Sequence, residues 1–461
     1  MKTATQGSSP LARHFSALSL LRFALPSIGM MLVISLYTLT DGIFIGRYAG
    51  PTALAASNIV YPAVNLAWGI AIMLASGGSA LVAKTLGEQK PRLARERFTL
   101  IAFVGLLAGS SLGLLLFLFF DEALQLLGAT PELLPDARAY LGALLPFFPT
   151  TALLMIFNAF YIADGRPILG FLVALAAGAT NAVLDYVFLA HLGLGVYGAG
   201  LATGLADTLE MSIGLWYFAR LSRSFRFTRF HVEWRALWQT VSNGISEMVT
   251  QISIGVTTFL FNLITYAWAG ENGVAAITVI LYAELLMTSV LIGFSTGIAP
   301  IFSYHYGAKN NGELVRLVRL ALLTLTGAGL LAFGAAQLLG APLVALFLPG
   351  GGEVAALTLD GFSLFSLSFL LCGYNLFASG FFTAISDGRT SALLSFARNF
   401  AGIVISLLVL PHFLGLTGVW LAVPAADAVA VLLSAYCLLS EVRTLRRRQQ
   451  AEPRSLVSQP T

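Results

Sequence analysis

Residues 18–46 read LSLLRFALPSIGMMLVISLYTLTDGIFIG, an apolar stretch interrupted by one base, Arg22, and one acid, Asp41. A helix needs about 20 apolar residues to cross the hydrocarbon core of a bilayer, which is about 30 Å thick. The stretch therefore predicts a membrane-spanning helix. Near its end the helix carries a carboxyl group, at a depth where charged side chains are rare and usually functional.

The same composition extends over the whole chain. Of its 461 residues, 57% are apolar and only 10% are charged, whereas an ordinary soluble domain carries about 25% charged residues. A soluble enzyme, a nucleic-acid-binding protein and a disordered protein all match this composition poorly. Twelve apolar stretches predict membrane spans at residues 18–46, 54–82, 98–120, 134–162, 167–190, 198–220, 238–268, 274–304, 316–340, 356–384, 391–412 and 417–440.

The positions of the basic residues predict how the chain lies in the membrane. If the N-terminus is cytoplasmic and the spans alternate, all of the 26 Lys and Arg residues except Arg47 and Arg138 fall on the cytoplasmic side. Cytoplasmic loops are normally enriched in Lys and Arg. We therefore expect a multi-pass protein of the cell (inner) membrane with both termini in the cytoplasm.

The chain resembles itself when it is shifted by 220 residues. Gly87 then falls on Gly307, and both glycines precede a basic loop. The tripeptide Asp164-Gly165-Arg166 recurs as Asp387-Gly388-Arg389, where the shift has grown to 223. Each half holds six predicted spans, so both halves start on the same side of the membrane.

The predicted fold is an all-α polytopic membrane protein with twelve transmembrane helices in two parallel, pseudo-symmetric lobes of six helices. Its expected segments are a cytoplasmic N-terminal segment 1–17, an N-lobe 18–220, a basic cytoplasmic linker 221–237, a C-lobe 238–441 and a basic cytoplasmic tail 442–461. Parallel repeats of this kind are typical of secondary transporters, whose binding sites lie between the two halves near mid-membrane. The sequence holds no GxxxxGK[ST] phosphate-binding motif and no selectivity-filter sequence, so the energy must come from an ion gradient, a partner or the substrate.

Two acids within the predicted spans stand out as candidates for ion binding. Asp41 lies late in the first span, and Asp185 lies in the fifth, four residues after Asn181. Residues four apart share one face of a helix, and hard cations favour oxygen ligands. Under the 220-residue shift, Asp41 corresponds to Phe261 and Asp185 to an apolar residue, so we expect the ion site in the N-lobe only.

Other residues of the spans are weaker candidates. Pro26 removes a backbone hydrogen bond from the first span and permits a bend. Glu247 and Glu284 lie inside the first two spans of the second half and are candidates for contact with a cationic substrate, while Asp207, Glu210 and Asp427 are further intramembrane acids. Aromatic walls with a few acids suit flat cations, and the candidate aromatics are Tyr37, Phe157, Phe160, Tyr161, Phe259 and Phe261.

Together these features resemble the multidrug and toxic compound extrusion (MATE) transporters, most closely their prokaryotic DinF-like branch. The resemblance rests on the two parallel halves, on Pro26 and Asp41, and on Asn181-x-x-x-Asp185, and it covers roughly residues 15–441. It implies export of organic, often cationic or aromatic, compounds in exchange for Na⁺ or H⁺ by alternating access.

The resemblance also implies roles for individual residues. The cation site of the N-lobe would comprise Asp41, Asn181, Asp185 and Thr203, which are also the expected ligands if the ion is Na⁺. Tyr140 and Asn158 would assist, and Ala199 would offer a backbone carbonyl. The other branch of the family uses acids of the C-lobe; Glu247 and Glu284 leave that option open.

Two alternatives remain open at this point. One is a flippase for lipid or lipid-linked oligosaccharide from the same superfamily, although the spans hold almost no basic residue apart from Arg398, which we expect at the cytoplasmic rim. The other is a membrane-embedded enzyme, for which no nucleophile–base pair or DDxxD motif is present. We expect no cofactor and no nucleic-acid partner, and we expect a monomer that contacts only small organic substrates and membrane lipid.

Overall fold

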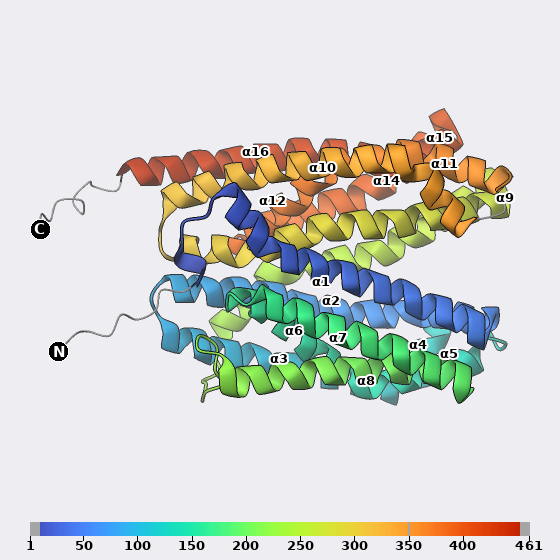
Figure 1. The fold of residues 1–461 in the computed structure, drawn as a ribbon, viewed down its shortest axis with the longest axis horizontal. Helices are drawn as coiled ribbons and strands as arrows, with labels where there is room; N and C mark the ends of the chain where they lie inside the picture. The colour runs from blue at the N-terminus through green and yellow to red at the C-terminus, as the bar shows by residue number, and fades with distance from the viewer. Residues whose placement is uncertain (1–9, 349–350, 452–461) are drawn as a thin grey trace, which may run out of the picture.

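The computed structural model describes residues 10–348 and 351–451. Residues 1–9 and 452–461 of the expected N-terminal segment and tail, and residues 349–350, lie outside the described part. Every regular element within these ranges is helical, so the prediction of an all-α fold is confirmed. Figure 1 shows long helices in two side-by-side groups, and the start of α1 lies at the same end of the bundle as the end of α16.

The first lobe contains the helices of the N-terminal half. Their bounds are α1 Ala17–Phe44, α2 Pro51–Gly87, α3 Pro91–Leu118, α4 Phe120–Leu126, α5 Leu134–Leu144, α6 Phe148–Ala163, α7 Pro167–Asp185 and α8 Gly195–Trp216. Short 3-10 or π-helical turns adjoin them: η1 Pro10–Ala12, η2 Ile45–Ala49, η3 Leu145–Phe147, η4 Tyr186–His191 and η5 Tyr217–Leu221. Proline occupies the first turn of α2, α3 and α7, where its missing N–H removes no helical hydrogen bond.

The second lobe contains the helices of the C-terminal half. Their bounds are α9 Trp234–Gly307, α10 Asn311–Phe347, α11 Glu353–Phe365, α12 Cys372–Ala384, α13 Gly388–Ser395, α14 Ile403–Leu414, α15 Leu416–Trp420 and α16 Ala422–Ala451, with η6 Ser366–Leu370 and η7 Phe396–Gly402 between them. α9 holds two spans. They meet at Gly270, whose φ of 59° and ψ of −150° are not helical and suit a residue without a Cβ.

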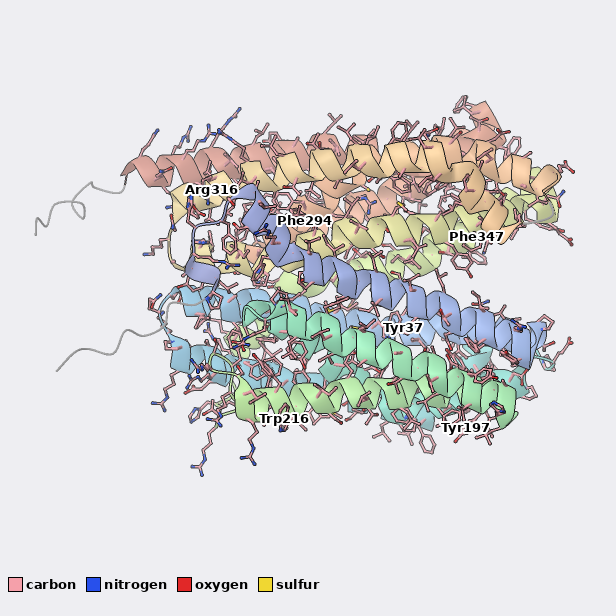
Figure 2. The ribbon with its side chains drawn as sticks, in the orientation of Figure 1. Tyr37, Tyr197, Trp216, Phe294, Arg316 and Phe347 are labelled. Atoms are coloured by element: carbon pink, nitrogen blue, oxygen red, sulfur yellow. The ribbon has the colours of Figure 1, made fainter. Side chains whose placement is uncertain are left out.

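Ten stretches are long and apolar enough to cross a membrane among the residues described, with α9 counted as one and α8 not included. Division of α9 at Gly270 and inclusion of α8 give the twelve expected spans. Figure 2 places Tyr197 and Trp216 at opposite ends of α8, and both side chains are exposed. Exposed aromatic residues at both ends of a span are typical of the two membrane interfaces.

The two ends of the bundle differ in charge. One end carries the start of α1, the end of α16 and the loop 222–233 with Arg223, Arg226 and Arg229, and we call it the basic end. The opposite end, which we call the far end, carries the loop around Gly270 and the segment 119–133. α1 runs from the basic end to the far end, so Asp41 lies close to the far end.

The lobes touch closely at the basic end, where helices α2 and α9 approach through glycines. A Cβ on Gly87 would lie 2.9 Å from the carbonyl carbon of Tyr304, and a Cβ on Gly307 would lie 2.8 Å from that of Lys84. Each contact is the other shifted by 220 residues, which confirms the repeat in three dimensions. Gly77 against Gly244 adds a third such approach, as small residues allow at the interfaces of membrane helices.

The segment before α1 packs across the same end. Leu11 and Phe15 are fully buried, and Pro10 lies against Gly165 of the first lobe. The His14 ring lies 3.0 Å from the carboxylate of Glu313 in the second lobe. Residues 10–16 thus contact both lobes where they meet.

Candidate functional site

Four acids of the first lobe lie within the bundle, on three helices. Asp41 is near the far end of α1, and Asp185 is the last residue of α7. Asp207 and Glu210 stand one turn apart on α8, nearer to the basic end. Because the side chains of residues three apart lie on the same helix face, the two acids of α8 are directed toward the same neighbours.

Asp41 and Asp185 form the outer pair of acids. Their carboxyl groups are close enough to interact with each other, and Asp185 is fully buried. Oδ1 of Asp41 and both carboxyl oxygens of Asp185 have no hydrogen-bond partner among the described residues. Buried acceptors without donors are costly, by about 1–3 kcal/mol for each group, so this pair is suited to a proton or a cation that binds between its oxygens.

Asn181, Thr203 and Tyr140 lie around this pair. The amide nitrogen of Asn181 donates to Oγ1 of Thr203 over 3.4 Å. Its amide oxygen has no partner in the part of the chain that is described. Asn181 is 1% exposed, so a further oxygen ligand is available inside the lobe.

Two hollows open beside these residues, and three residues line both: Tyr37, Thr203 and Asp207. The outer hollow has a volume of about 40 Å³ and is also lined by Thr38, Asp41, Tyr61, Val64, Ala67, Trp68, Tyr140, Leu144, Phe148 and Thr151. The inner hollow has a volume of about 20 Å³ and is also lined by Ile34, Leu154, Met155, Asn158, Ala174, Ala177, Gly178, Asn181, Ala206 and Glu210. Tyr37 lies in the second half of α1, one turn before Asp41 (Figure 2).

The two acids of α8 accept hydrogen bonds from neutral donors. The Thr151 hydroxyl donates to Asp207 over 2.6 Å, and the Asn158 amide donates to Glu210 over 2.8 Å. Neither hollow has a Lys or Arg in its described lining. A buried carboxylate without a basic partner is expensive, so the negative charge of this lobe requires protons or cations for compensation.

Several expected cavity residues lie elsewhere. Phe157 and Tyr161 are buried in an aromatic cluster around Phe218, because α6 turns that face toward α3 and η5. Phe261 packs in the core of the second lobe, and Phe259 is 65% exposed on the lobe's surface. None of these four lines a hollow described above.

Four further expected residues line neither hollow. Ala199 is fully buried in the core that also contains Tyr140, and it lines neither hollow. Glu247 and Glu284 of α9 are half-buried in the second lobe. Pro26 lies inside an α1 that continues as one helix through it. Just beyond Pro26, α1 touches Gly293 of α9, where a Cβ would lie 2.5 Å from the Cα of Ile28.

In the second lobe, the buried acid Asp427 is paired with a basic residue. Nε of Arg398 donates to the Asp427 carboxylate over 2.5 Å, and Asn375 donates to the same oxygen over 3.0 Å. Arg398 is thus buried and ion-paired, so the expectation that it sits at the cytoplasmic rim is wrong: the fully buried carboxylate of α16 draws it into the lobe. Asp427 is neutralised by a base, whereas its repeat mate Asp207 is not.

Sequence reasoning missed Thr151, Tyr61 and Trp68 as lining residues. Thr151 and Asn158 are seven residues apart, two turns along one helix, and they face the two acids of α8. Two polar residues at this spacing on one face of a predicted span are a signal that could have identified Thr151. No comparable signal marks Tyr61 or Trp68, whose direction depends on how α2 is rotated in the lobe.

Comparisons with known proteins agree with this architecture. The sequence profile of the MatE family matches residues 26–187 and 247–408. The multidrug export protein MepA of Staphylococcus haemolyticus (strain JCSC1435) is 22% identical over 441 residues, which cover 95% of this chain and 96% of that protein.

Solved structures share the fold. A crystal structure of MATE in complex with MaL6 superposes with a TM-score of 0.91 at 22% identity, covering 96% of this chain and 100% of the other. An outward-facing multidrug resistance MATE family transporter of the MOP superfamily also gives 0.91 at 22% identity, over 97% of this chain and 100% of the other. The two matched profile regions, one in each lobe, span well over half of the sequence, and the chain belongs to the MatE family.

Proposed function

We propose that this chain is a cation-coupled antiporter that exports organic, cationic or aromatic compounds in exchange for H⁺ or Na⁺ by alternating access. The observation that carries the proposal is the outer pair, in which three carboxyl oxygens of Asp41 and Asp185 have no partner among the described residues. With the free amide oxygen of Asn181 and the hydroxyls of Thr203 and Tyr140 nearby, these oxygens suit a proton or a small hard cation.

The direction of transport follows from the two ends. Enrichment in Lys and Arg supports a cytoplasmic position for the basic end, and this is the orientation that we propose, in the cell (inner) membrane with both termini inside. In this structure the lobes are sealed at that end by Gly87 and Gly307. The outer pair near the far end is therefore the place where a cation from outside binds. One chain contains the complete site, so the working unit is a monomer.

The coupling is thermodynamic. A cation at Asp41 and Asp185 removes negative charge between α1 and α7 and allows these helices to pack more closely. It drives export only if it binds the two states of the transporter with different affinity. α1 also packs against α9 beside Gly293, so a shift of α1 reaches the contact between the lobes.

The linings of the hollows carry groups that suit a compound with an aromatic and a cationic part, and the hollows must widen from the size they have in this state to admit it. Tyr61 and Trp68 of the outer hollow offer ring faces, and Asp207 stands where the two hollows meet. Cations bind over aromatic rings within about 6 Å of the ring centre. The relative MepA is a multidrug export protein, which supports cargo of this kind.

No observation favours the flippase. A pyrophosphate-linked lipid needs basic residues in the cavity, whereas Arg398 is paired with Asp427. The described linings of both hollows carry acids and no Lys or Arg.

The test uses purified protein in lipid vesicles with ethidium as cargo and separately imposed pH and Na⁺ gradients. Asp41→Asn and Asp185→Asn should abolish gradient-driven ethidium transport, because an amide neither takes up a proton nor carries charge. Asp360→Asn, at an exposed acid of α11, is the matched control and should transport normally. Gradient-driven transport that survives both pair substitutions would refute the coupling site, and movement of a labelled lipid alone would refute the cargo.

A further inference from the structure

A second set of polar groups continues from the inner hollow toward the basic end, inside the first lobe. Glu210 lies close enough to Tyr161 for an electrostatic interaction. The rings of Tyr161 and Tyr217 lie 5.4 Å apart. The Tyr217 hydroxyl donates to the Asp164 carboxylate over 2.6 Å, and Asp164 follows α6 at the basic end.

Packing alone gives no reason for a hydroxyl group at position 161, where the residue is Tyr161. The side chain is fully buried in a cluster whose other members around Phe98 and Phe218 are mostly phenylalanines. Its hydroxyl has no hydrogen-bond partner within residues 10–348 and 351–451. An unsatisfied buried hydroxyl costs about 1–3 kcal/mol, and phenylalanine would fill the same space without that cost.

The hydroxyl of the neighbouring Tyr217, in contrast, has a hydrogen-bond acceptor. Tyr217 is held by Asp164, and Asp164 also accepts from the Ser222 hydroxyl over 2.9 Å. Arg166, at the start of α7, is close enough to interact with Tyr217. At the basic end, the series of polar groups therefore ends in the Asp164 carboxylate. This carboxylate accepts hydrogen bonds from two hydroxyl groups, and the positive charge of Arg166 lies near Tyr217.

We propose that protons leave the outer pair for the cytoplasm through the first lobe itself, by way of Asp207, Glu210, Tyr161, Tyr217 and Asp164. The inference rests on the proposed antiport function and specifies its ion as H⁺. The route lies within one lobe and does not pass between the lobes, which the glycine contacts close at the basic end.

Each step conserves atoms and charge. Protonated Asp41 first gives its proton to the Asp207 carboxylate through the outer hollow, which both residues line. Protonated Asp207 then passes the proton along α8 to the Glu210 carboxylate. Protonated Glu210 then gives its proton to the Tyr161 oxygen, while the original Tyr161 proton moves to the Tyr217 oxygen. The Tyr217 proton moves to Asp164 at the same time, so both tyrosines end neutral and Asp164 holds the proton. Asp164 releases it to water, favoured by the positive charge of Arg166 nearby.

The series is interrupted in this structure, which is required of a coupled antiporter. Glu210 is bound to Asn158, and the Tyr161 hydroxyl has no partner in the described chain. The gaps on both sides of Tyr161, toward Glu210 and toward Tyr217, prevent a passive proton leak in this state. Closing them requires a rotation of the Glu210 side chain away from Asn158 and of the Tyr161 side chain, or a bridging water at each gap.

The experiment compares two transport modes of the reconstituted full-length chain. Uptake of radiolabelled ethidium driven by a pH gradient requires proton release in every cycle, whereas exchange of labelled for unlabelled ethidium does not. Tyr161→Phe and Tyr217→Phe should slow pH-driven uptake at least roughly tenfold and leave the exchange rate unchanged.

Tyr374→Phe is the matched control, because it removes a tyrosine hydroxyl from α12 of the second lobe, where it is 2.7 Å from Thr326. It should leave both modes intact. Normal pH-driven uptake by both tyrosine variants would overturn the route, and so would an equal loss of exchange, which indicates a packing role. If a Na⁺ gradient drives transport by the wild-type protein and a pH gradient does not, the proton route is wrong but the proposed antiport function stands. If neither gradient drives transport, the proposed function itself is wrong.

Discussion

The glycine contacts between the lobes make the sharpest prediction. Substitution of alanine at both Gly87 and Gly307 should prevent tight closure of the basic end. A Cβ at these positions would lie 2.9 and 2.8 Å from the carbonyl carbons of Tyr304 and Lys84, whereas carbon atoms prefer separations of about 3.5–4.0 Å. The obstacles are backbone atoms, so α2 and α9 must separate by roughly 0.6–1.2 Å to accommodate the methyl groups.

The energetic consequence applies only to the state in which the basic end is closed. Overpacking of a tight contact costs about 1–3 kcal/mol, which shifts a two-state equilibrium by about 5- to 150-fold. Neither glycine has a positive φ, so alanine adds no backbone strain to confuse the result. The population with an open basic end should rise accordingly.

Spin-label distances measure this shift. One pair of labels at exposed Arg92 and Arg447 reports on the basic end, and another at Leu126 and Phe413 reports on the far end. In the double alanine variant, the basic-end distance should lengthen and the far-end distance should shorten.

Gly255→Ala is the matched control. Gly255 lies on α9, and a Cβ there would meet nothing within 4 Å. It carries the same gain in helix propensity, up to about 1 kcal/mol, without the clash. If the distance distributions of the double variant equal those of wild type and of Gly255→Ala, the contacts of Gly87 and Gly307 do not determine how tightly the basic end closes.

Three further predictions concern stability. Glu233 receives two hydrogen bonds from Arg97, at 2.9 and 2.7 Å, which hold its pKa below the ordinary value; the folded state therefore gains stability above the unfolded-state pKa and loses it as the pH falls through the folded-state pKa. Glu233→Gln should lower the unfolding free energy by about 0.5 kcal/mol at neutral pH, since the pair is partly exposed, and thermal melts at pH 7 and pH 3 should converge at the lower pH. Arg398→Leu should destabilise by about 3–5 kcal/mol because Asp427 is left unpaired, while the double change to leucine at both positions should restore much of the loss; equal melts for the single and double variants would contradict this. Phe15→Ala, which removes a fully buried ring, should cost about 3–5 kcal/mol, and an unchanged melting temperature would show that residues 10–16 do not hold the basic end.

Much of the fold could be predicted from the sequence because hydrophobic length and charge position are local properties. The twelve spans and the 220-residue repeat follow from them, and the contacts of Gly87 and Gly307 show the repeat in space. The prominence of Asp41 and Asp185 follows as well, because a carboxyl group in a span is rare in any arrangement of helices.

Side-chain partnerships between helices could not be predicted in the same way. Whether Arg398 faces the membrane rim or Asp427 depends on the rotation of the helix formed by η7 and α14 against α16. The rotation of α6 likewise decides that Asn158 faces Glu210 whereas Phe157 enters the aromatic cluster. Such rotations depend on packing over the whole lobe, which no local pattern of residues specifies.

The unequal treatment of the repeat-related acids has an electrical consequence. Asp427 is neutralised by Arg398 within its own lobe, whereas the hollows of the first lobe hold acids without a base in their described linings. A transmembrane voltage acts on unbalanced charge, by about 2.3 kcal/mol per elementary charge for each 100 mV. The membrane potential therefore acts mainly on the first lobe, and the turnover of this protein should depend on voltage through the charge state of that lobe alone.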